Sequence, residues 1–300
     1  MTNPLVSIVC ITYNHEPYLP QALDGCLMQR TTFPIEIILA EDCSTDGTRA
    51  ICEEYAKRYP DKIRYIWSET NVGAVANERR AMEAAQGKYI AFCEGDDYWT
   101  DADKLQRQVD FMESHPDYSV TFHRYRIYDE QTGQWQEDKS AFIIPAEEKE
   151  GCDITIEQSL SVWVTQYLTA VIRREQYDFA WVDKYKWYRD SHMFYHLMTK
   201  GKAYLFAFIG GVYRKTGKGV YSEQNNYATC IKNIEVYREL WERNDDERLR
   251  KPYIKAMQYF VDICGSSNKF RTSTWKIVAE LYQTTRNKRT FLKNIVKILS

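Results

Sequence analysis

The chain has 300 residues, of which 44% are hydrophobic and 27% are charged. This length suits one large α/β domain with an appendage, and the composition is that of a globular protein, which excludes a disordered chain. The formal net charge of −2 gives no reason to expect a nucleic-acid partner. The eight cysteines show no C-x-x-C spacing, which argues against a zinc ribbon or a thioredoxin motif and favours free thiols in a reducing compartment.

The N-terminus reads Met-Thr-Asn-Pro and has no basic segment followed by an apolar one, so it does not resemble a signal peptide. Apolar runs stay shorter than the ~18 residues that span a bilayer. We therefore expect a cytoplasmic protein, either soluble or attached peripherally at the inner face of the plasma membrane.

The first 126 residues alternate between short β-rich runs and stretches with apolar residues at helical spacing. The predicted strands are Leu5–Thr12, Ile35–Ala40, Ile63–Trp67, Tyr89–Cys93 and Ser119–Arg126. The predicted helices are Pro17–Gln29, Thr48–Tyr59, Val75–Gln86 and Lys104–Ser114. This alternation predicts an α/β fold: a Rossmann-like, mostly parallel sheet with flanking helices.

The pattern breaks at Asp129–Glu150, an acidic stretch that we interpret as a surface excursion. A strand is expected over Trp163–Arg173, a helix over Asp190–Lys200, and one or two strands over Ala203–Arg214. The remainder predicts helices over Asn225–Trp241, Glu247–Cys264, Ser273–Thr284 and Lys288–Leu299. We expect a domain over residues 1–222, made of a nucleotide-binding half (1–126) and an acceptor half (127–222), followed by a helical C-terminal extension (223–300).

Polar clusters follow the first four predicted strands, at the sheet edge where open α/β proteins bind ligands. They are Thr12-Tyr13-Asn14, Glu41-Asp42 with the following Cys-Ser-Thr-Asp-Gly-Thr, Asn71-Val72-Gly73, and Glu94-Gly95-Asp96-Asp97. In the second cluster a carboxylate could accept hydrogen bonds from a nucleobase. Equally, Ser44, Thr45 or Asp46 could simply cap the next helix.

The fourth cluster places three carboxylates within four residues, directly after a buried strand. Such charges repel each other unless a cation neutralises them, and alternate positions could aim Glu94 and Asp96 at one point. Carboxylate oxygens together with substrate phosphates suit Mg²⁺ or Mn²⁺. The alternative is a solvated acidic turn that caps the following helix.

Four motifs, taken in their order along the chain, closely resemble the family 2 glycosyltransferases of the GT-A fold. They are V-S-I-V-C-I-T-Y-N, I-I-L-A-E-D-C-S-T-D-G-T, N-V-G and G-K-Y-I-A-F-C-E-G-D-D-Y-W. The resemblance covers roughly residues 4–126. It implies that Glu41 and Asp42 bind the donor base and that Glu94-Gly95-Asp96 corresponds to the D-x-D metal and diphosphate site, with Glu94 in place of the first Asp. We assign Thr12, Tyr13, Asn14, Asn71 and Gly73 to the donor nucleotide as well.

The resemblance continues at Tyr188-Arg189-Asp190, where the family Asp serves as the catalytic base; the plain alternative for Asp190 is a helix N-cap. The segment from Tyr213 to Ser222 resembles Y-R-x-H-x-G-G-x-W-S, with Thr216 at the family His. Lys215 or Lys218 could supply charge to the diphosphate instead. The expected contacts of the sugar or acceptor are Asp97, Tyr98, Trp99, Trp187 and Tyr188. The alternative for the aromatic residues among them is a place in the hydrophobic core, where most aromatic residues lie.

The implied activity is inverting transfer of a single sugar from a nucleotide-sugar donor, expected to be a UDP-sugar, to a hydroxyl of a saccharide or lipid-linked acceptor. The setting would be synthesis of surface polysaccharide or lipid-linked oligosaccharide. One rival is a sugar-nucleotide nucleotidyltransferase, which the absence of a Gly-rich basic loop after the first strand disfavours. A second is a non-catalytic nucleotide- or carbohydrate-binding relative. No G-x-G-x-x-G follows any predicted strand, which disfavours a NAD-dependent enzyme.

The last 33 residues carry eight Lys or Arg and one acid. Within them one apolar helical face is predicted, formed by Phe291, Leu292, Ile295, Val296 and Leu299. The basic residues lie largely outside this face. This helix could pack on the rest of the protein, or it could lie on an anionic membrane as a peripheral contact.

Overall fold

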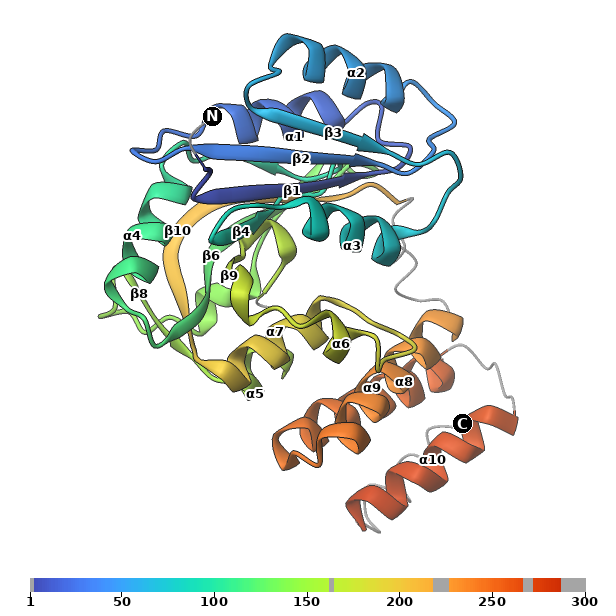
Figure 1. Cartoon of the computed structure of the whole chain (residues 1–300). Helices are drawn as coiled ribbons and strands as arrows, with labels where there is room; N and C mark the ends of the chain where they lie inside the picture. Colours follow the sequence, from blue (N-terminus) through green and yellow to red (C-terminus); the bar gives the residue numbers. More distant parts are fainter. Residues whose placement is uncertain (1–2, 162–164, 218–226, 267–271, 287–300) are drawn as a thin grey trace. The chain divides into compact units, whose positions relative to one another are not determined.

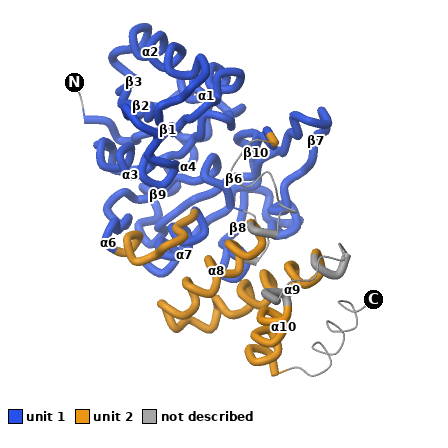
Figure 2. The backbone as a smooth tube through the Cα atoms, turned by 90° about the vertical axis from the view of Figure 1, so that its right-hand side faces the viewer, with its two compact units in different colours: residues 1–180, 190–216 blue, residues 181–189, 217–300 orange. Residues whose placement is uncertain are grey.

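The computed structural model describes residues 3–161, 165–217, 227–266 and 272–286 (Figure 1). The chain divides into two compact units, a first unit of residues 1–180 and 190–216 and a second unit of residues 181–189 and 217–300 (Figure 2). The segment Trp181–Arg189 thus groups with the C-terminal helices.

The first unit is built on one sheet with the strand order β3-β2-β1-β4-β9-β6-β10-β5, in which β7 also pairs with β6 and β8 with β10. The pairings make β1, β2, β3, β4, β6 and β10 run in one direction. The bounds are β1 Val6–Thr12, β2 Ile35–Glu41, β3 Ile63–Trp67, β4 Tyr89–Phe92, β5 Tyr98–Trp99, β6 Tyr118–Asp129, β7 Gln134–Glu137, β8 Gly151–Ile154, β9 Val171–Arg173 and β10 Lys202–Lys215. The predicted mostly parallel α/β sheet is confirmed.

Helices flank this sheet on both faces. Helices α1 and α2 lie on one face of the β1–β3 region and α3 on the other (Figure 1). The helices are α1 Leu19–Leu27, α2 Thr48–Arg58, α3 Ala74–Ala84, α4 Lys104–Ser114, α5 Ile156–Ser161, α6 Phe179–Val182, α7 Asp190–Lys200, α8 Tyr227–Asn244, α9 Arg250–Ser266 and α10 Thr272–Thr285. Short 3₁₀ turns occur at Lys139–Phe142, Tyr167–Thr169, Arg174–Gln176 and Glu247–Leu249.

The strand predicted over Trp163–Arg173 is wrong for residues 165–170, because only Val171–Arg173 pairs in the sheet. The preceding residues form a 3₁₀ turn whose carbonyls bind side chains instead of a neighbouring strand. Leu168 O accepts from Trp99 Nε1 at 2.8 Å, and Thr169 O accepts from Gln108 Nε2 at 3.0 Å. Residues 162–164 lie outside the described part of the chain.

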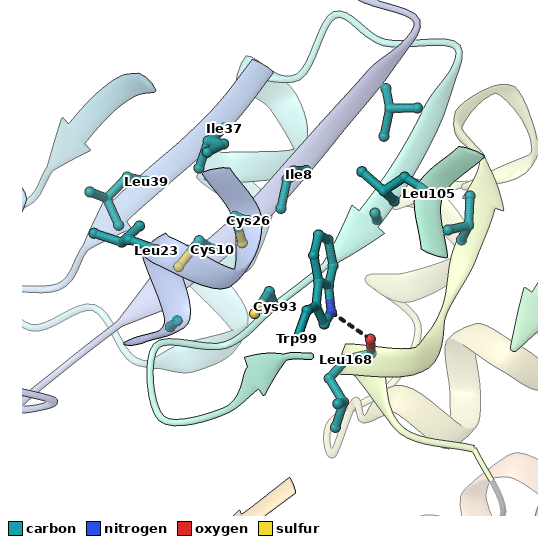
Figure 3. Close-up of a cluster of buried hydrophobic side chains, with 14 of the residues drawn as sticks. Ile8, Cys10, Leu23, Cys26, Ile37, Leu39, Cys93, Trp99, Leu105 and Leu168 are labelled. Carbon is teal, nitrogen blue, oxygen red and sulfur yellow. Dashed lines mark hydrogen bonds between the residues drawn. The ribbon is translucent and has the colours of Figure 1, made fainter. Parts of the chain in front are cut away.

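Trp99 anchors the main hydrophobic core of the first unit (Figure 3). Its side chain is 2% exposed, and the ammonium of the equally buried Lys104 lies 3.7 Å from the ring centroid. Gly25 on α1 allows this packing, since a Cβ there would lie 2.9 Å from Trp99 O. Burial of this aromatic ring therefore fixes the strand that directly follows the acidic cluster.

The second unit contains α8, α9 and α10, whose apolar faces form a separate core around Tyr253, Met257 and Phe260. Arg238 on α8 donates from Nε and Nη2 to the Glu280 carboxylate on α10, at 2.9 and 2.7 Å. This paired geometry adds a directional contact to the apolar packing. The described helices include none with the length and apolar character needed to cross a membrane. The predicted helix Lys288–Leu299 lies outside the described residues.

Candidate active site

The carboxyl ends of the parallel strands bring the predicted polar clusters to one edge of the sheet. Thr12 on β1 is in register with Glu41 on β2, which is in register with Trp67 on β3. Gly95 N donates to Ile11 O at 2.9 Å, so the acidic loop after β4 lies against the end of β1. Clusters that are far apart in the sequence are therefore neighbours in the folded protein.

The loops predicted to hold the nucleotide are tied to one another by side chains. Asp42 accepts from Val72 N at 2.8 Å and from Gly73 N at 2.9 Å, which fixes the Asn71-Val72-Gly73 loop. Gly73 has a φ of 86°, a backbone conformation that favours glycine. Asn14 accepts from Thr45 N at 2.8 Å, and Tyr13 next to it is 41% exposed.

Glu41 is fully buried, and its carboxylate accepts from Arg49 Nε at 2.7 Å and from Ser44 N. The carboxylates of Glu41 and Asp42 thus hold loops in place in this structure. Both are predicted to bind the donor base, and the exposed ring of Tyr13 directly follows Thr12, which is in register with Glu41.

Four carboxylates act on one another at this edge. Burial raises the pKa of Glu94, and the nearby charges of Asp96, Glu78 and Asp190 raise it further. Burial raises the pKa of Glu78 to about 8, against a hydrogen bond from the Tyr167 hydroxyl and with a further increase from Asp190. The mutual repulsion places Asp190, the first residue of α7, in the same electrostatic environment as the acidic loop.

Gly95 in this loop lies against two polar side-chain atoms. A Cβ at Gly95 would lie 2.6 Å from Thr12 Oγ1 and 2.8 Å from His15 Nδ1, so a larger residue would collide with both. These two atoms are buried and have no hydrogen-bond partner among the described residues. His15 Nε2 lies 3.8 Å from Asp96 Oδ2. Unpartnered polar atoms around a glycine are the arrangement expected where a polar ligand completes the site.

Asp97 has a structural partner. It is 1% exposed, and its Oδ1 accepts from the backbone N of Arg214 at 2.8 Å. Burial raises its pKa, followed by the charges of Asp96 and Glu94. Arg214 also donates from Nη1 to Asp96 O at 3.1 Å, and its Nε lies 3.1 Å from Glu130. Arg214 therefore connects β10 to the acidic loop.

Several residues with predicted roles are placed elsewhere. Trp99 was expected at the acceptor, but it is buried in the core with Lys104 on its ring, so Tyr98 is the candidate that remains from that pair. Lys215 does not join the carboxylates: its Nζ donates to Gln136 on β7 at 3.1 Å. Lys218 lies outside the described residues.

Trp187 and Tyr188 belong to the second unit. There the ammonium groups of Lys186 and Lys232 lie 5.1 and 5.7 Å from the Trp187 ring centroid. The neighbouring Arg189 donates to Asn233 on α8 within the same unit. Their predicted role at the acceptor stays a prediction.

Three residues with contacts at the site carried no predicted role: His15, Glu78 and Arg214. Arg214 stands within the Tyr213–Ser222 motif, so its position was available from the sequence. His15 follows the first cluster directly and could have been included on that ground. Glu78 lies within α3 in the polar run N-E-R-R, which gives no signal of burial.

The residues fit a divalent cation that relies on substrate phosphates for much of its coordination. Among the described residues, no three His, Cys, Asp or Glu side chains converge closely enough to hold a metal ion by themselves. Mg²⁺ and Mn²⁺ are often held by one or two carboxylates plus phosphates and water. Burial, followed by the charges of neighbouring carboxylates, raises the pKa of Glu94 and of Asp97, and a bound cation would favour the charged form of both groups.

The chain is similar in sequence to bacterial proteins. TuaG of Bacillus subtilis, a glycosyltransferase named for teichuronic acid biosynthesis, is 32% identical over 274 residues, which cover 90% of this chain and 100% of TuaG. An uncharacterized protein of Mycobacterium tuberculosis is 52% identical over 122 residues, which cover 41% of this chain. The match spans 35%, about a third, of the length of that mycobacterial relative.

Solved structures show the same fold at low identity. Residues 1–349 of TarS of S. aureus, crystallised in complex with UDP, have a TM-score of 0.64 and 16% identity, and the match covers 98% of this chain and 87% of that TarS chain. The mannosyltransferase PcManGT of Pyrobaculum calidifontis, in complex with GDP-Man and Mn²⁺, has a TM-score of 0.59 and 15% identity, covering 100% of this chain and 88% of PcManGT. These similarities concern the fold alone.

The family model described as glycosyl transferase family 2 matches residues 7–196, a span that begins in β1, includes the acidic loop and ends within α7. Together with the full-length match to TuaG, this shows that the chain is a member of glycosyl transferase family 2.

Proposed function

We propose that this protein is a metal-dependent, inverting glycosyltransferase that moves one sugar from a nucleotide-sugar donor to an acceptor hydroxyl. A UDP-sugar is the proposed donor. The acceptor would be a saccharide or a lipid-linked oligosaccharide in the synthesis of a surface polysaccharide, a setting supported by the similarity to TuaG. Complexes of structural neighbours with UDP and with GDP-Man support a nucleotide-sugar donor.

One observation carries the proposal: Asp190, from the start of α7, shares an electrostatic environment with Glu94 and Asp96, from the loop after β4. The two segments are far apart in sequence, yet the charge of Asp190 raises the pKa of Glu94. Glycosyl transfer by a single displacement requires such a pair of functions, namely a base for the acceptor hydroxyl and a site for the departing diphosphate.

Asp96 and Glu94 would hold Mg²⁺ or Mn²⁺, with Asp96 the more accessible ligand at 21% side-chain exposure. When bound, the metal ion would neutralise negative charge on the donor diphosphate. Asp190 would accept the proton of the acceptor hydroxyl. Gly95, Thr12 and His15 would face the polar part of the donor, and Tyr13, Asn14, Glu41, Asp42, Asn71 and Gly73 would shape the nucleotide site.

A donor panel tests this function directly. Thermal shift with UDP, GDP, TDP and CMP, each with and without Mn²⁺, identifies the nucleotide, because a ligand that binds only the native state raises the melting temperature. Hydrolysis of the matching nucleotide sugar then distinguishes an enzyme from a non-catalytic relative. A nucleotide that binds without any donor turnover would favour the non-catalytic alternative.

We also propose peripheral membrane contact through residues 288–299. In liposome flotation with anionic vesicles at low salt, the intact chain should float, because each basic residue near an anionic surface adds ~1 kcal/mol. A chain ending at Thr285 should stay in solution. If both forms stay in solution, this segment does not bind membranes.

A further inference from the structure

A row of aromatic rings extends from the acidic loop along the sheet. Its members are Tyr18 just before α1, Tyr98 on β5, Tyr128 on β6 and Trp135 on β7, which we call the aromatic stripe. Trp135 is 47% exposed, and the three tyrosines are partly exposed. All four belong to the first unit.

Strand register places the rings of β5, β6 and β7 on one face of the sheet. Tyr98 is in register with Val212 of β10, and Arg214, two residues further along β10, is in register with Tyr128. Tyr128 in turn is directly opposite Trp135, with ring centroids 4.7 Å apart. Residues two apart on a strand, and residues in register on neighbouring strands, share a face.

Arginine side chains fill the spaces between the rings. The Arg214 guanidinium lies 4.4 Å from the Tyr98 ring centroid and 5.2 Å from that of Tyr18. Arg126, on the same face of β6, lies 4.8 Å from the centroid of Trp135. Glu137, opposite Arg126, adds a carboxylate to this face. The stripe thus alternates ring faces with groups that can donate and accept hydrogen bonds.

The stripe is continuous with the proposed catalytic loop. Arg214, which contacts two of its rings, also binds Asp97 Oδ1 through its backbone N and Asp96 O through Nη1. Burial raises the pKa of Tyr18, and the charge of Asp96 contributes to the same shift, so this ring lies within electrostatic reach of the loop. One end of the stripe is therefore at the proposed site of transfer.

The far end lies well away from that site. Three strand spacings separate β5 from β7 through β10 and β6, which corresponds to about 14 Å. This distance exceeds the size of one sugar ring. A ligand that uses the whole stripe must therefore be longer than a monosaccharide.

The geometry points to the aromatic stripe as the binding surface for an extended saccharide acceptor of several sugar units, with the reacting end beside the loop that carries Asp96 and the preceding units along Tyr98, Tyr128 and Trp135. This inference rests on the proposed glycosyl transfer and specifies its acceptor. Sugar rings present apolar C–H faces and polar edges, which match exposed ring faces interleaved with Arg126 and Glu137. A membrane is the less suitable partner, because the arginines of the stripe are already neutralised: Arg214 lies 3.1 Å from Glu130 and Arg126 lies 3.7 Å from Glu137.

The test uses the full chain and three saccharide ladders, made of N-acetylglucosamine, glucose or galacturonic acid units, each from the monosaccharide to the hexasaccharide. Calorimetric titration in the presence of UDP and Mn²⁺ should show affinity that rises with length for at least one ladder and then levels off. Trp135→Ala should weaken the longer members by about tenfold and leave the monosaccharide unchanged, because only longer members reach β7.

Two further variants separate binding from folding. Trp135→Phe keeps a ring over Tyr128 and should restore most of the gain with length. Trp67→Ala is the matched control, since Trp67 is also exposed, at 57%, and also stacks on a tyrosine two residues away on its own strand; it should leave the length dependence intact.

Affinity that does not depend on length, or equal losses in Trp135→Ala and Trp67→Ala, would overturn the inference. So would the failure of all three ladders to bind. Donor hydrolysis, measured in parallel, keeps the two hypotheses apart: hydrolysis without any ladder binding rejects the stripe and leaves the proposed function standing. Loss of flotation with phosphatidylglycerol vesicles in Trp135→Ala, without a change in saccharide affinity, would show that the stripe binds membranes instead.

Discussion

Asp97 Oδ1 accepts a hydrogen bond at 2.8 Å from the backbone N of Arg214, a residue 117 positions later in the chain. This contact joins the loop after β4 to β10, the last strand along the chain. The guanidinium of the same arginine also donates to Asp96 O. The acidic loop is therefore held from β10 as well as from β1. Its geometry depends on two segments that meet only in the folded protein.

Arg214→Lys tests this link. The side chain of Arg214 is 5% exposed and uses three nitrogens on three different acceptors, a geometry that lysine cannot reproduce. We expect a loss of roughly 1–3 kcal/mol in the free energy of unfolding, as for lost buried hydrogen bonds, and a lower kcat. Arg30→Lys is the control, because Arg30 is 71% exposed and forms a surface ion pair with Asp103. Equal effects of both changes would contradict the role of Arg214.

Asp96→Ala should abolish sugar transfer without unfolding the protein. The change removes a proposed metal ligand from a loop and takes nothing from the hydrophobic core. Activity with Mn²⁺ and circular dichroism measure the two effects separately. Full activity of this variant, or of the intact protein in EDTA, would rule out the proposed metal site.

Asp190→Asn should lower the rate by about 10²–10⁴-fold, the usual contribution of a general base. Asparagine caps helices about as well as aspartate, so α7 should still begin at this residue. Donor binding in the thermal-shift assay should persist, which separates a lost proton acceptor from a lost fold. An unchanged rate would assign the base to another carboxylate of the cluster.

Glu78→Gln should change how stability depends on pH. Burial raises the pKa of Glu78 to about 8 in the folded protein, from 4.5 for the exposed group. The folded state therefore holds this proton across that interval while the unfolded state loses it, so the stabilisation is complete below about pH 4.5 and is lost as the pH rises towards 8.

This loss amounts to about 5 kcal/mol at most, and glutamine, which does not titrate, should remove it. Denaturant unfolding of both proteins at pH 5.5 and pH 8.5 measures the difference in slope. Parallel pH profiles of the wild type and the variant would show that Glu78 does not titrate in this way.

The long parallel strands and their helices could be predicted because their signals are local. Runs such as Ile35–Glu41 are apolar on both faces, and α4 begins and ends at the residues predicted for it, Lys104 and Ser114. The short strands β5 and β8 could not, because two to four residues carry no periodicity and their pairing depends on the distant strand β10.

The candidate site shows the same division. Loops after successive parallel strands must meet at one edge, so the proximity of Thr12, Glu41 and Gly95 followed from strand order. The hydrogen-bond partners of the side chains could not be predicted from strand order. The sequence around Asp42 does not show whether its carboxylate binds the backbone of the loop at Gly73, as it does here, or a ligand. Likewise, the hydroxyl that donates to Glu78 belongs to Tyr167, which is 89 positions away.

The three-residue strand β9 runs antiparallel between β4 and β6 and is the piece of sheet through which these two strands connect. A growing polypeptide presents β1 to β4 and β6 long before residues 171–173 are made. Until then both strands keep open edges, the condition that promotes aggregation. We therefore expect a fragment ending at residue 126 to be poorly soluble, and chaperones that shield nascent strands to improve the yield of the whole chain.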